Sequence, residues 1–151
     1  STQSRSSAAS DVYKRQMPLL SWNSSLSVGI PSMDAQHQKL INIINRLHDA
    51  MREGKGKDVI APVLLELHNY TVTHFTAEEK LMEQCKYEGL ALQKQQHSNF
   101  VNQIKKYQSD LEKGSLSLPL SVSNFLKDWL VNHIQGMDKK YESSMKSAGI
   151  K

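Results

Sequence analysis

Apolar residues recur at helical spacing through the centre of the chain. Between residues 60 and 85 they fall at intervals of three and four, the period of an amphipathic helix. This face consists of Ile60, Val63, Leu64, Leu67, Thr71, His74, Glu78, Leu81, Met82 and Cys85. His74 and Glu78 lie one turn apart on it. Because an ionised Glu is rarely buried without a partner, this pair predicts a neighbouring cation, and a metal ion is the simplest candidate.

Three further segments have the same period, and glycine or proline lies in the breaks between them. Asp34 is the candidate N-cap of the first helix, which the two glycines of residues 53–57 bring to an end. The helix with His74 begins at Asp58 and has Pro62 in its first turn, where proline is tolerated. The predicted helices span about 34–52, 58–84, 90–111 and 119–144, the last of them kinked near Gly136.

Four helices of this length with short loops predict an all-α fold, an up-down-up-down antiparallel four-helix bundle. No segment has the period of a strand. An irregular all-α domain is the alternative, and the short loops disfavour it. Residues 17–33 hold two prolines, a glycine and scattered apolar residues, so we expect an irregular N-terminal arm with Trp22 packed against the domain.

Composition changes this picture mainly at the N-terminus. Residues 1–16, STQSRSSAASDVYKRQ, are polar and Ser-rich, and we interpret them as a disordered, artefactual leader before a single domain of residues 17–151. They carry a net charge of +2 out of +4, so the rest is nearly balanced and gives little support for nucleic acid or a membrane surface as partner. With no secretory signal, no membrane-length apolar run and one cysteine, we expect a cytoplasmic protein.

Polar residues interrupt the inner stripe of every predicted helix. A lone His on such a stripe is more often structural, and we assign His48 and His68 to structural and exposed positions. Four imidazoles and two carboxylates converging from four helices would cost several kcal/mol each if unpaired. Asp138 is about 140° round from His133 on a straight helix, so it joins them only if the chain bends near Gly136. The converging set is His37, His74, Glu78, Gln93, His97, His133 and Asp138.

The donor types restrict the metal. The set holds no thiolate, and we expect Cys85 to be a small buried hydrophobe, so a Cys-rich zinc site is excluded. Imidazole mixed with carboxylate suits iron best, with zinc, copper and manganese left open. Six donors, with Gln93 as a candidate seventh, are too many for one ion and fit two, with Glu78 and Asp138 bridging. The Glu-x-x-His signature of ferritin-type sites does not occur, and fewer anionic ligands favour reversible dioxygen binding.

Several motifs together resemble one family over nearly all of residues 17–150. They are Trp22 followed by Val28-Gly29-Ile30, Asp34-x-x-His37-x-x-Leu40, His74-Phe75-x-x-Glu78-Glu79, His97, and His133-Ile134-x-x-Met137-Asp138. In these the chain resembles the hemerythrins, in particular the single-domain bacteriohemerythrins. The resemblance implies two iron ions (Fe²⁺/Fe³⁺) with an oxo or hydroxo bridge. It also implies reversible dioxygen binding, as carrier, store or local supply, and no enzymatic reaction on an organic substrate.

The same resemblance assigns a role to each residue. His37 and His74 resemble the ligands of the iron that keeps a position open for dioxygen, and His97 and His133 those of the other, filled iron. Glu78 and Asp138 resemble the bridging carboxylates. The family has a further His one turn before His97, where this chain has Gln93. Its amide either ligates weakly or leaves the second iron loosely held, and we expect di-iron binding to be retained.

Other functions follow from different interpretations of the same residues. A peroxide- or nitric-oxide-consuming di-iron enzyme is favoured if Gln93 opens a position on the second iron. An oxygen or iron sensor would need a separate signalling partner. A metal-free bundle used for interaction is the fourth alternative. The expected partners are dioxygen and an iron-dependent, oxygen-using enzyme that it supplies, with no nucleic acid, no membrane and a monomeric state.

Overall fold

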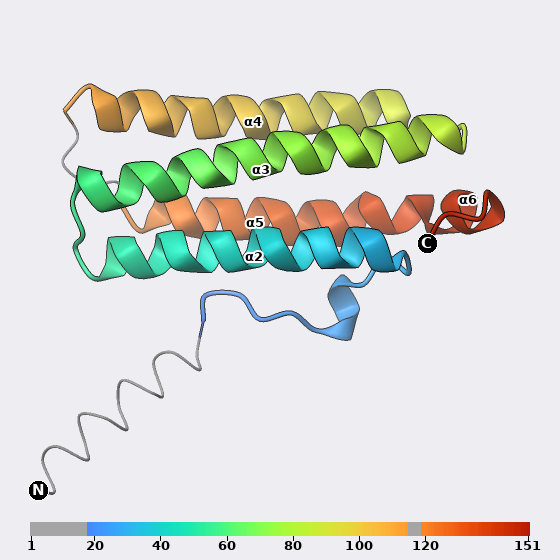
Figure 1. Cartoon of the computed structure of the whole chain (residues 1–151), viewed down its shortest axis with the longest axis horizontal. Helices are drawn as coiled ribbons and strands as arrows, with labels where there is room; N and C mark the ends of the chain where they lie inside the picture. Colours follow the sequence, from blue (N-terminus) through green and yellow to red (C-terminus); the bar gives the residue numbers. More distant parts are fainter. Residues whose placement is uncertain (1–17, 115–118) are drawn as a thin grey trace, which may run out of the picture.

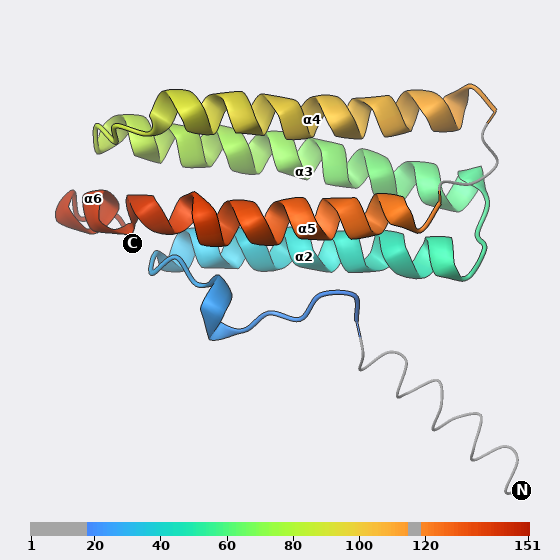
Figure 2. The ribbon, with the colours of Figure 1, turned by 180° about the vertical axis from the view of Figure 1, so that it is seen from behind.

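A computed structural model of the chain describes residues 18–114 and 119–151. Over these ranges it has no strand, and four long helices run alternately up and down, side by side (Figures 1 and 2). Helix α3 packs against both α2 and α4, and α2 also packs against α5. The predicted four-helix bundle is therefore confirmed, whereas the predicted leader, residues 1–16, lies outside the described residues. The helices are α2 (Pro31–Arg52), α3 (Lys57–Gln84), α4 (Leu90–Glu112) and α5 (Ser121–Gly136).

An irregular arm precedes the bundle and lies along α2 (Figure 1). Its only regular element is a short 3-10 helix, η1 (Ser24–Leu26). Leu20 and Asn45 of α2 exchange two hydrogen bonds, from the Leu20 N–H to Oδ1 (3.0 Å) and from Nδ2 to the Leu20 carbonyl (2.8 Å). Trp22 is half-buried against the core, as expected, and the fully buried residues of the arm are Leu26, Val28 and Ile30.

Three helix starts differ from the prediction, and the simplest case is α5, which begins at Ser121 instead of near residue 119. Helix α2 begins at Pro31 instead of Asp34, because proline at the first position has its φ already set and needs no N–H partner. Asp34 lies in the first turn and accepts hydrogen bonds from the Val28 N–H (2.8 Å) and the Ser27 hydroxyl (2.6 Å), so it fixes the arm instead of capping the helix. In α3, Pro62 is the sixth residue and lies beyond the first turn, where it removes one backbone hydrogen bond.

The predicted break near Gly136 is present. Helix α5 ends at Gly136. The chain continues as a 3-10 helix, η2 (Asp138–Tyr141), and a short helix, α6 (Glu142–Ser147). The helical region therefore ends at Ser147, three residues beyond the predicted end at 144. Met137, which lies between α5 and η2, has φ −118° and ψ −54°, and this backbone conformation turns the following residue inward. As a result Asp138 is 1 % exposed and lies on the same side as His133.

The interior of the bundle differs between its two ends. At the end where α2 passes into α3, the buried residues are mostly aliphatic, with Ser123 as a buried polar exception. The aliphatic residues include Leu47, Ile60, Leu64, Ile104, Leu111 and Leu126. The helical period of the sequence also puts Phe125 on the inner stripe of the fourth predicted helix, with Val122, Leu126 and Trp129. In the structure Phe125 is 41 % exposed, because α5 turns Leu126 and Leu130 inward. The other end holds the buried polar residues. Among the described residues, no helix is sufficiently long and apolar to span a lipid bilayer.

Candidate metal centre

All seven residues singled out from the sequence converge at one end of the bundle. Helices α2 and α4 begin at this end, and α3 and α5 finish there (Figure 1). None of the seven is more than 4 % exposed, so the whole set belongs to the interior. They are His37 of α2, His74 and Glu78 of α3, Gln93 and His97 of α4, His133 of α5 and Asp138 of η2.

The first half of the cluster joins α2 and α3. His37 Nε2 lies 3.3 Å from Glu78 Oε2 and 3.3 Å from Asp138 Oδ2. His74 Nε2 lies 3.5 Å from the same Glu78 oxygen, and the two imidazole rings meet edge to face with centroids 4.8 Å apart. Two imidazole nitrogens thus face one oxygen of a shared carboxylate.

The second half joins α4 and α5. His97 Nε2 lies 3.2 Å from Glu78 Oε1 and 3.1 Å from His133 Nε2, which is itself 3.1 Å from Asp138 Oδ1. Each carboxylate therefore divides its two oxygens between the two halves. One ligand-type atom from each of His37, His74 and Glu78 lies within 4.8 Å of the others in the first half. The same holds in the second half for Glu78, His97, His133 and Asp138. Such spacing suits atoms that share one ion at about 2.0–2.2 Å.

The protonation pattern shows that a cation fits this set. His97 and His133 place Nδ1 against the side-chain oxygens of Glu79 (2.8 Å) and Gln96 (2.9 Å), and an Nδ1–H must donate there. Their Nε2 lone pairs then face each other and the carboxylate oxygens, so acceptors face acceptors in the neutral state. Glu78 Oε1 is buried with no hydrogen-bond donor. Metal ions satisfy such converging lone pairs, and a hydrogen-bonded Nδ1 is the usual companion of a metal-binding Nε2.

Gln93 lies inside the cluster. Its Nε2 donates to Asp138 Oδ1 at 3.0 Å. A carboxylate only accepts, so the amide nitrogen must face it, and Oε1 is the free end of the amide. That oxygen is buried and has no hydrogen-bond partner. It can therefore serve as a neutral donor to an ion in the second half.

Mutual charge controls the protonation of the cluster. Burial opposes the charged form of both carboxylates, yet the surrounding histidines hold the pKa of Glu78 well below its usual value and also lower the pKa of Asp138. Burial likewise opposes protonation of His37, but hydrogen bonds to Asp138 and Glu78 raise its pKa to about 9. For His74 burial dominates and lowers the pKa to about 4. The cluster thus keeps its two carboxylates charged, as ligands require.

Four residues that support the ligands were given no role from the sequence, although Glu79 is part of one of the family motifs. Three hold histidine Nδ1 atoms: Gln36 on His74 (2.7 Å), Glu79 on His97 and Gln96 on His133. Each of the three is next to a predicted ligand in the sequence, and this adjacency is the feature that could have pointed to it. The fourth is Tyr141, whose hydroxyl donates to Glu78 Oε2 at 2.7 Å. Burial, followed by the charges of Glu78 and Asp138, raises the pKa of Tyr141, so it remains a donor.

Aromatic rings cover the second half of the cluster. Phe75 stacks on the His97 ring with centroids 3.7 Å apart and planes at 2°. Trp129 stacks on the His133 ring at 4.5 Å and 10°. These rings fix the imidazole orientations and exclude water, which strengthens every electrostatic contact in the cluster.

The remaining histidines and cysteine lie away from the cluster. His48 is half-buried and bonds to Ser123 Oγ through Nδ1 (2.8 Å), which agrees with a structural role. His68, expected to be exposed, is half-buried beside Asn69. Cys85, expected to be buried, is only partly so.

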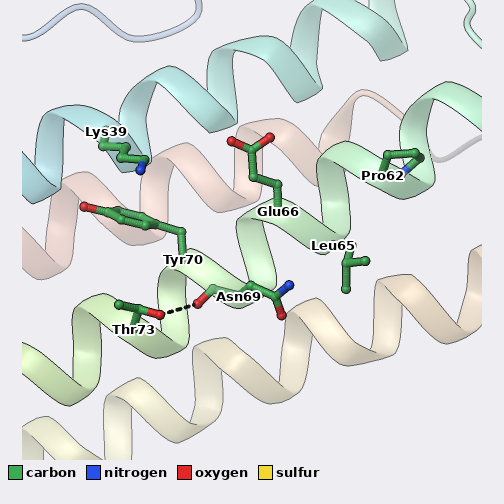
Figure 3. Close-up of a pocket in the computed structure, with 7 residues that line it drawn as sticks. All are labelled: Lys39, Pro62, Leu65, Glu66, Asn69, Tyr70 and Thr73. Atoms are coloured by element: carbon green, nitrogen blue, oxygen red, sulfur yellow. Dashed lines mark hydrogen bonds between the residues drawn. The ribbon is translucent and has the colours of Figure 1, made fainter.

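A surface hollow of about 460 Å³ between α2 and α3 contains no predicted ligand (Figure 3). Lys39 reaches into it from α2 and lies over the Tyr70 ring, 4.5 Å from its centroid. Thr73 donates to the Asn69 carbonyl at 3.0 Å, so that side chain is already satisfied. The hollow is open to solvent, and Thr73 and Lys39 contact other residues that line it. The buried cluster is therefore the stronger candidate for a functional site.

Fold and site together define a class, the four-helix bundle with a buried histidine and carboxylate cluster suited to metal ions. Residues 28–143 match the model of the Hemerythrin HHE cation binding domain. The chain belongs to the hemerythrin family, as its sequence motifs indicated. At the level of the family this is a di-iron, oxygen-binding class of protein.

Individual relatives agree with this assignment. The chain is 35% identical over 130 residues to a bacteriohemerythrin of Pseudomonas aeruginosa, covering 86% of this chain and 84% of that one. It is 32% identical over 124 residues to the myohemerythrin of Riftia pachyptila, covering 82% and 92%. A wild-type hemerythrin crystal structure superposes with a TM-score of 0.79 at 30% identity, covering 84% and 98%.

Proposed function

We propose that this protein holds two iron ions and binds dioxygen reversibly, as a carrier, store or local supply. One observation carries the proposal: each of two buried carboxylates divides its oxygens between two pairs of imidazole nitrogens. In the proposed site His37 and His74 hold one ion, and His97 and His133 hold the other. Glu78 and Asp138 bridge them, and the amide oxygen of Gln93 is available to the second ion.

The protein's own residues give this site its selectivity. Two bound ferrous ions would supply the electrons for reversible dioxygen binding, and the chain supplies their surroundings. The Tyr141 hydroxyl holds Glu78, the amides of Gln36 and Gln96 orient two imidazoles, and buried aromatic rings exclude water. A buried interior of this kind favours a small, uncharged molecule such as dioxygen over a charged one.

The surroundings of the cluster also argue against an organic substrate. Over residues 18–114 and 119–151, no Lys or Arg side chain forms an ion pair or hydrogen bond with the seven cluster residues. A substrate carboxylate or phosphate would require such a group. We therefore infer binding without turnover of an organic substrate.

The test is reconstitution with ferrous iron in the absence of air, followed by metal analysis and controlled admission of dioxygen. We expect two iron ions per chain and a charge-transfer band in the near-ultraviolet and visible that disappears when dioxygen is removed. Fewer than two ions, or a band that never reverses, would reject the proposal. His68 lies outside the cluster, so His68→Gln is the control and should leave both results unchanged.

A second candidate is a di-iron enzyme that consumes peroxide or nitric oxide. The observation that favours it is the buried, unpartnered oxygen of Gln93, a weaker donor than an imidazole. A loosely held position on the second ion would admit a second small molecule. This function predicts measurable peroxide turnover that falls in Gln93→His. Equal turnover in the two forms would remove Gln93 from the explanation.

A further inference from the structure

The four imidazoles of the cluster differ in the hydrogen-bond partner of Nδ1, the ring nitrogen that faces away from the centre of the cluster. His74 and His133 place Nδ1 against neutral amide oxygens, those of Gln36 (2.7 Å) and Gln96 (2.9 Å). His37 Nδ1 is buried with no hydrogen-bond partner. His97 alone among them has a carboxylate behind it, Glu79 Oε2 at 2.8 Å.

A carboxylate behind an imidazole changes that imidazole as a ligand. When Nδ1–H donates to an anion, electron density moves towards Nε2, which becomes a stronger donor to a cation. The hydrogen bond is also charge-assisted and therefore stronger than one to an amide. His97 is thus the most strongly donating of the four imidazoles, and it belongs to the half of the cluster that contains Gln93.

The Gln93 half has an amide where the hemerythrin pattern has a third imidazole, and the contact of Glu79 with His97 can offset this difference. Gln93 directs its nitrogen to Asp138 and has only a neutral amide oxygen left for an ion. Its half therefore has two imidazoles and a weak donor beside the shared carboxylates. Resting on the function proposed above, we propose that Glu79 is a positioning residue whose charge, acting through His97, compensates for the amide at position 93 and keeps the second ion bound.

The surroundings of Glu79 fit this role. The ring of Phe75 stacks on the His97 ring with centroids 3.7 Å apart, and this contact keeps Nδ1 directed at the carboxylate. Glu79 is 24 % exposed and has no Lys or Arg within ion-pairing distance among the described residues, so it is not an ordinary surface ion pair. Glu79 and His97 share the wall of a surface hollow of about 300 Å³.

The experiment is a double-mutant cycle on the full-length protein. The variants are Glu79→Gln, Gln93→His and the two combined, and the probe is cobalt(II) titrated against a competing chelator. Glu83→Gln is the matched control, because Glu83 is exposed one turn further along α3. Circular dichroism of each metal-free variant establishes that it is folded. The reduction potential of the iron-loaded forms is a second readout, which a purely structural role would not move.

We expect Glu79→Gln to weaken binding of the second cobalt ion by about 10–100-fold and to raise the reduction potential, since a negative charge that favours the oxidised ion is removed. In the Gln93→His background the loss should be clearly smaller, because an imidazole replaces the missing donor. Placing a carboxylate behind His133 instead, in Glu79→Gln with Gln96→Glu, should restore binding.

Different failures have different meanings. If the unsubstituted protein takes up fewer than two ions, the proposed function fails, and this inference fails with it. If two ions bind and Glu79→Gln behaves like Glu83→Gln, the inference alone is overturned. Glu79→Gln could also weaken cobalt binding equally with Gln93 retained and in the Gln93→His background. That result would show that Glu79 supports His97 without compensating for Gln93, and it would overturn the inference too. A metal-free Glu79→Gln chain that does not fold, and that Gln96→Glu does not rescue, counts against it as well.

Discussion

The two ends of the bundle contain opposite kinds of interior. Around Leu47, Ile60, Leu64 and Ile104 burial itself is stabilising, because each side chain leaves water without losing a hydrogen bond. Around His37 and Glu78 burial is costly and must be offset by hydrogen bonds, opposite charges or bound cations. The same helices serve both ends. The comparison indicates that the apolar end stabilises the fold without any ligand, whereas the polar end depends on opposite charges, hydrogen bonds or bound cations.

The largest expected effect comes from breaking the polar end. With each of two sites at a hundredfold excess of metal over Kd, binding contributes about 5 kcal/mol to the free energy of unfolding. Glu78→Gln replaces a carboxylate that serves both halves with a neutral amide, so we expect cobalt(II) to give this variant almost no stabilisation. Denaturant unfolding with and without metal measures the difference. Glu83→Gln should keep the full gain, and a Glu78→Gln protein that keeps it too would contradict a shared bridge.

Leu64→Ala tests the apolar end. Leu64 is fully buried, so truncation should cost about 3 kcal/mol through lost transfer energy and a residual cavity. The loss should be the same with and without metal, because Leu64 lies away from the ligands. Leu65, its neighbour in the sequence, is 51 % exposed, and Leu65→Ala should change stability by less than about 0.5 kcal/mol. A Leu64→Ala protein with reduced metal content would show that the two ends are coupled.

A third prediction concerns the pH dependence of the metal-free protein. The pKa of His37 is raised to about 9, so its contribution to stability is complete below pH 6.5 and is lost as pH rises towards 9. The pKa of His74 is lowered to about 4, so the unfolded chain takes up a proton first as pH falls from 6.5, and stability drops. Each slope is at most about 1.4 kcal/mol per pH unit. Stability should therefore peak near pH 6.5.

Two substitutions distinguish the pH-dependent contribution of the histidines to stability from the pH-independent contribution of the apolar core. His74→Gln should flatten the profile between about pH 5 and 6.5, measured by denaturant unfolding in the presence of a chelator. Leu64→Ala should lower the whole profile without changing its shape. A metal-free profile that is flat from about pH 5 to 9 would show that the histidines titrate as they do in water.

The apolar end was the easier end to predict from sequence. The helical period of residues such as Leu64 and Leu67 fixes which face is buried, whatever the partner helix is, and the helix number and order follow from the breaks. Errors occurred where tertiary context decides the outcome. Helix α2 starts at Pro31, and Asp34 bonds to the arm instead of capping the helix. Phe125 is exposed because the buried stripe of α5 is narrower than its apolar residues suggest.

At the polar end, the sequence predicted which residues converge but not how they are supported. Five donors on four stripes can be found from spacing alone, and Asp138 joins them only through the bend that was expected near Gly136. The partners on Nδ1 could not be found in this way, because Gln96 lies off the inner face and reaches His133 only through the packing of α4 against α5. Tyr141 depends on the 3-10 turn after Met137, whose geometry no helical period describes.

The smallest expected effect separates a structural histidine from a ligand. The Ser123 hydroxyl already donates to the Leu120 carbonyl at 2.9 Å, so it accepts from His48 Nδ1–H. His48→Gln should therefore cost at most about 1 kcal/mol and leave the metal content unchanged, whereas His74→Gln should reduce it. Elemental analysis of the two variants makes the comparison. Because the chemical change is the same at both positions, any difference in metal content comes from the surroundings. Equal metal loss in both variants would mean that His48 contributes to the centre.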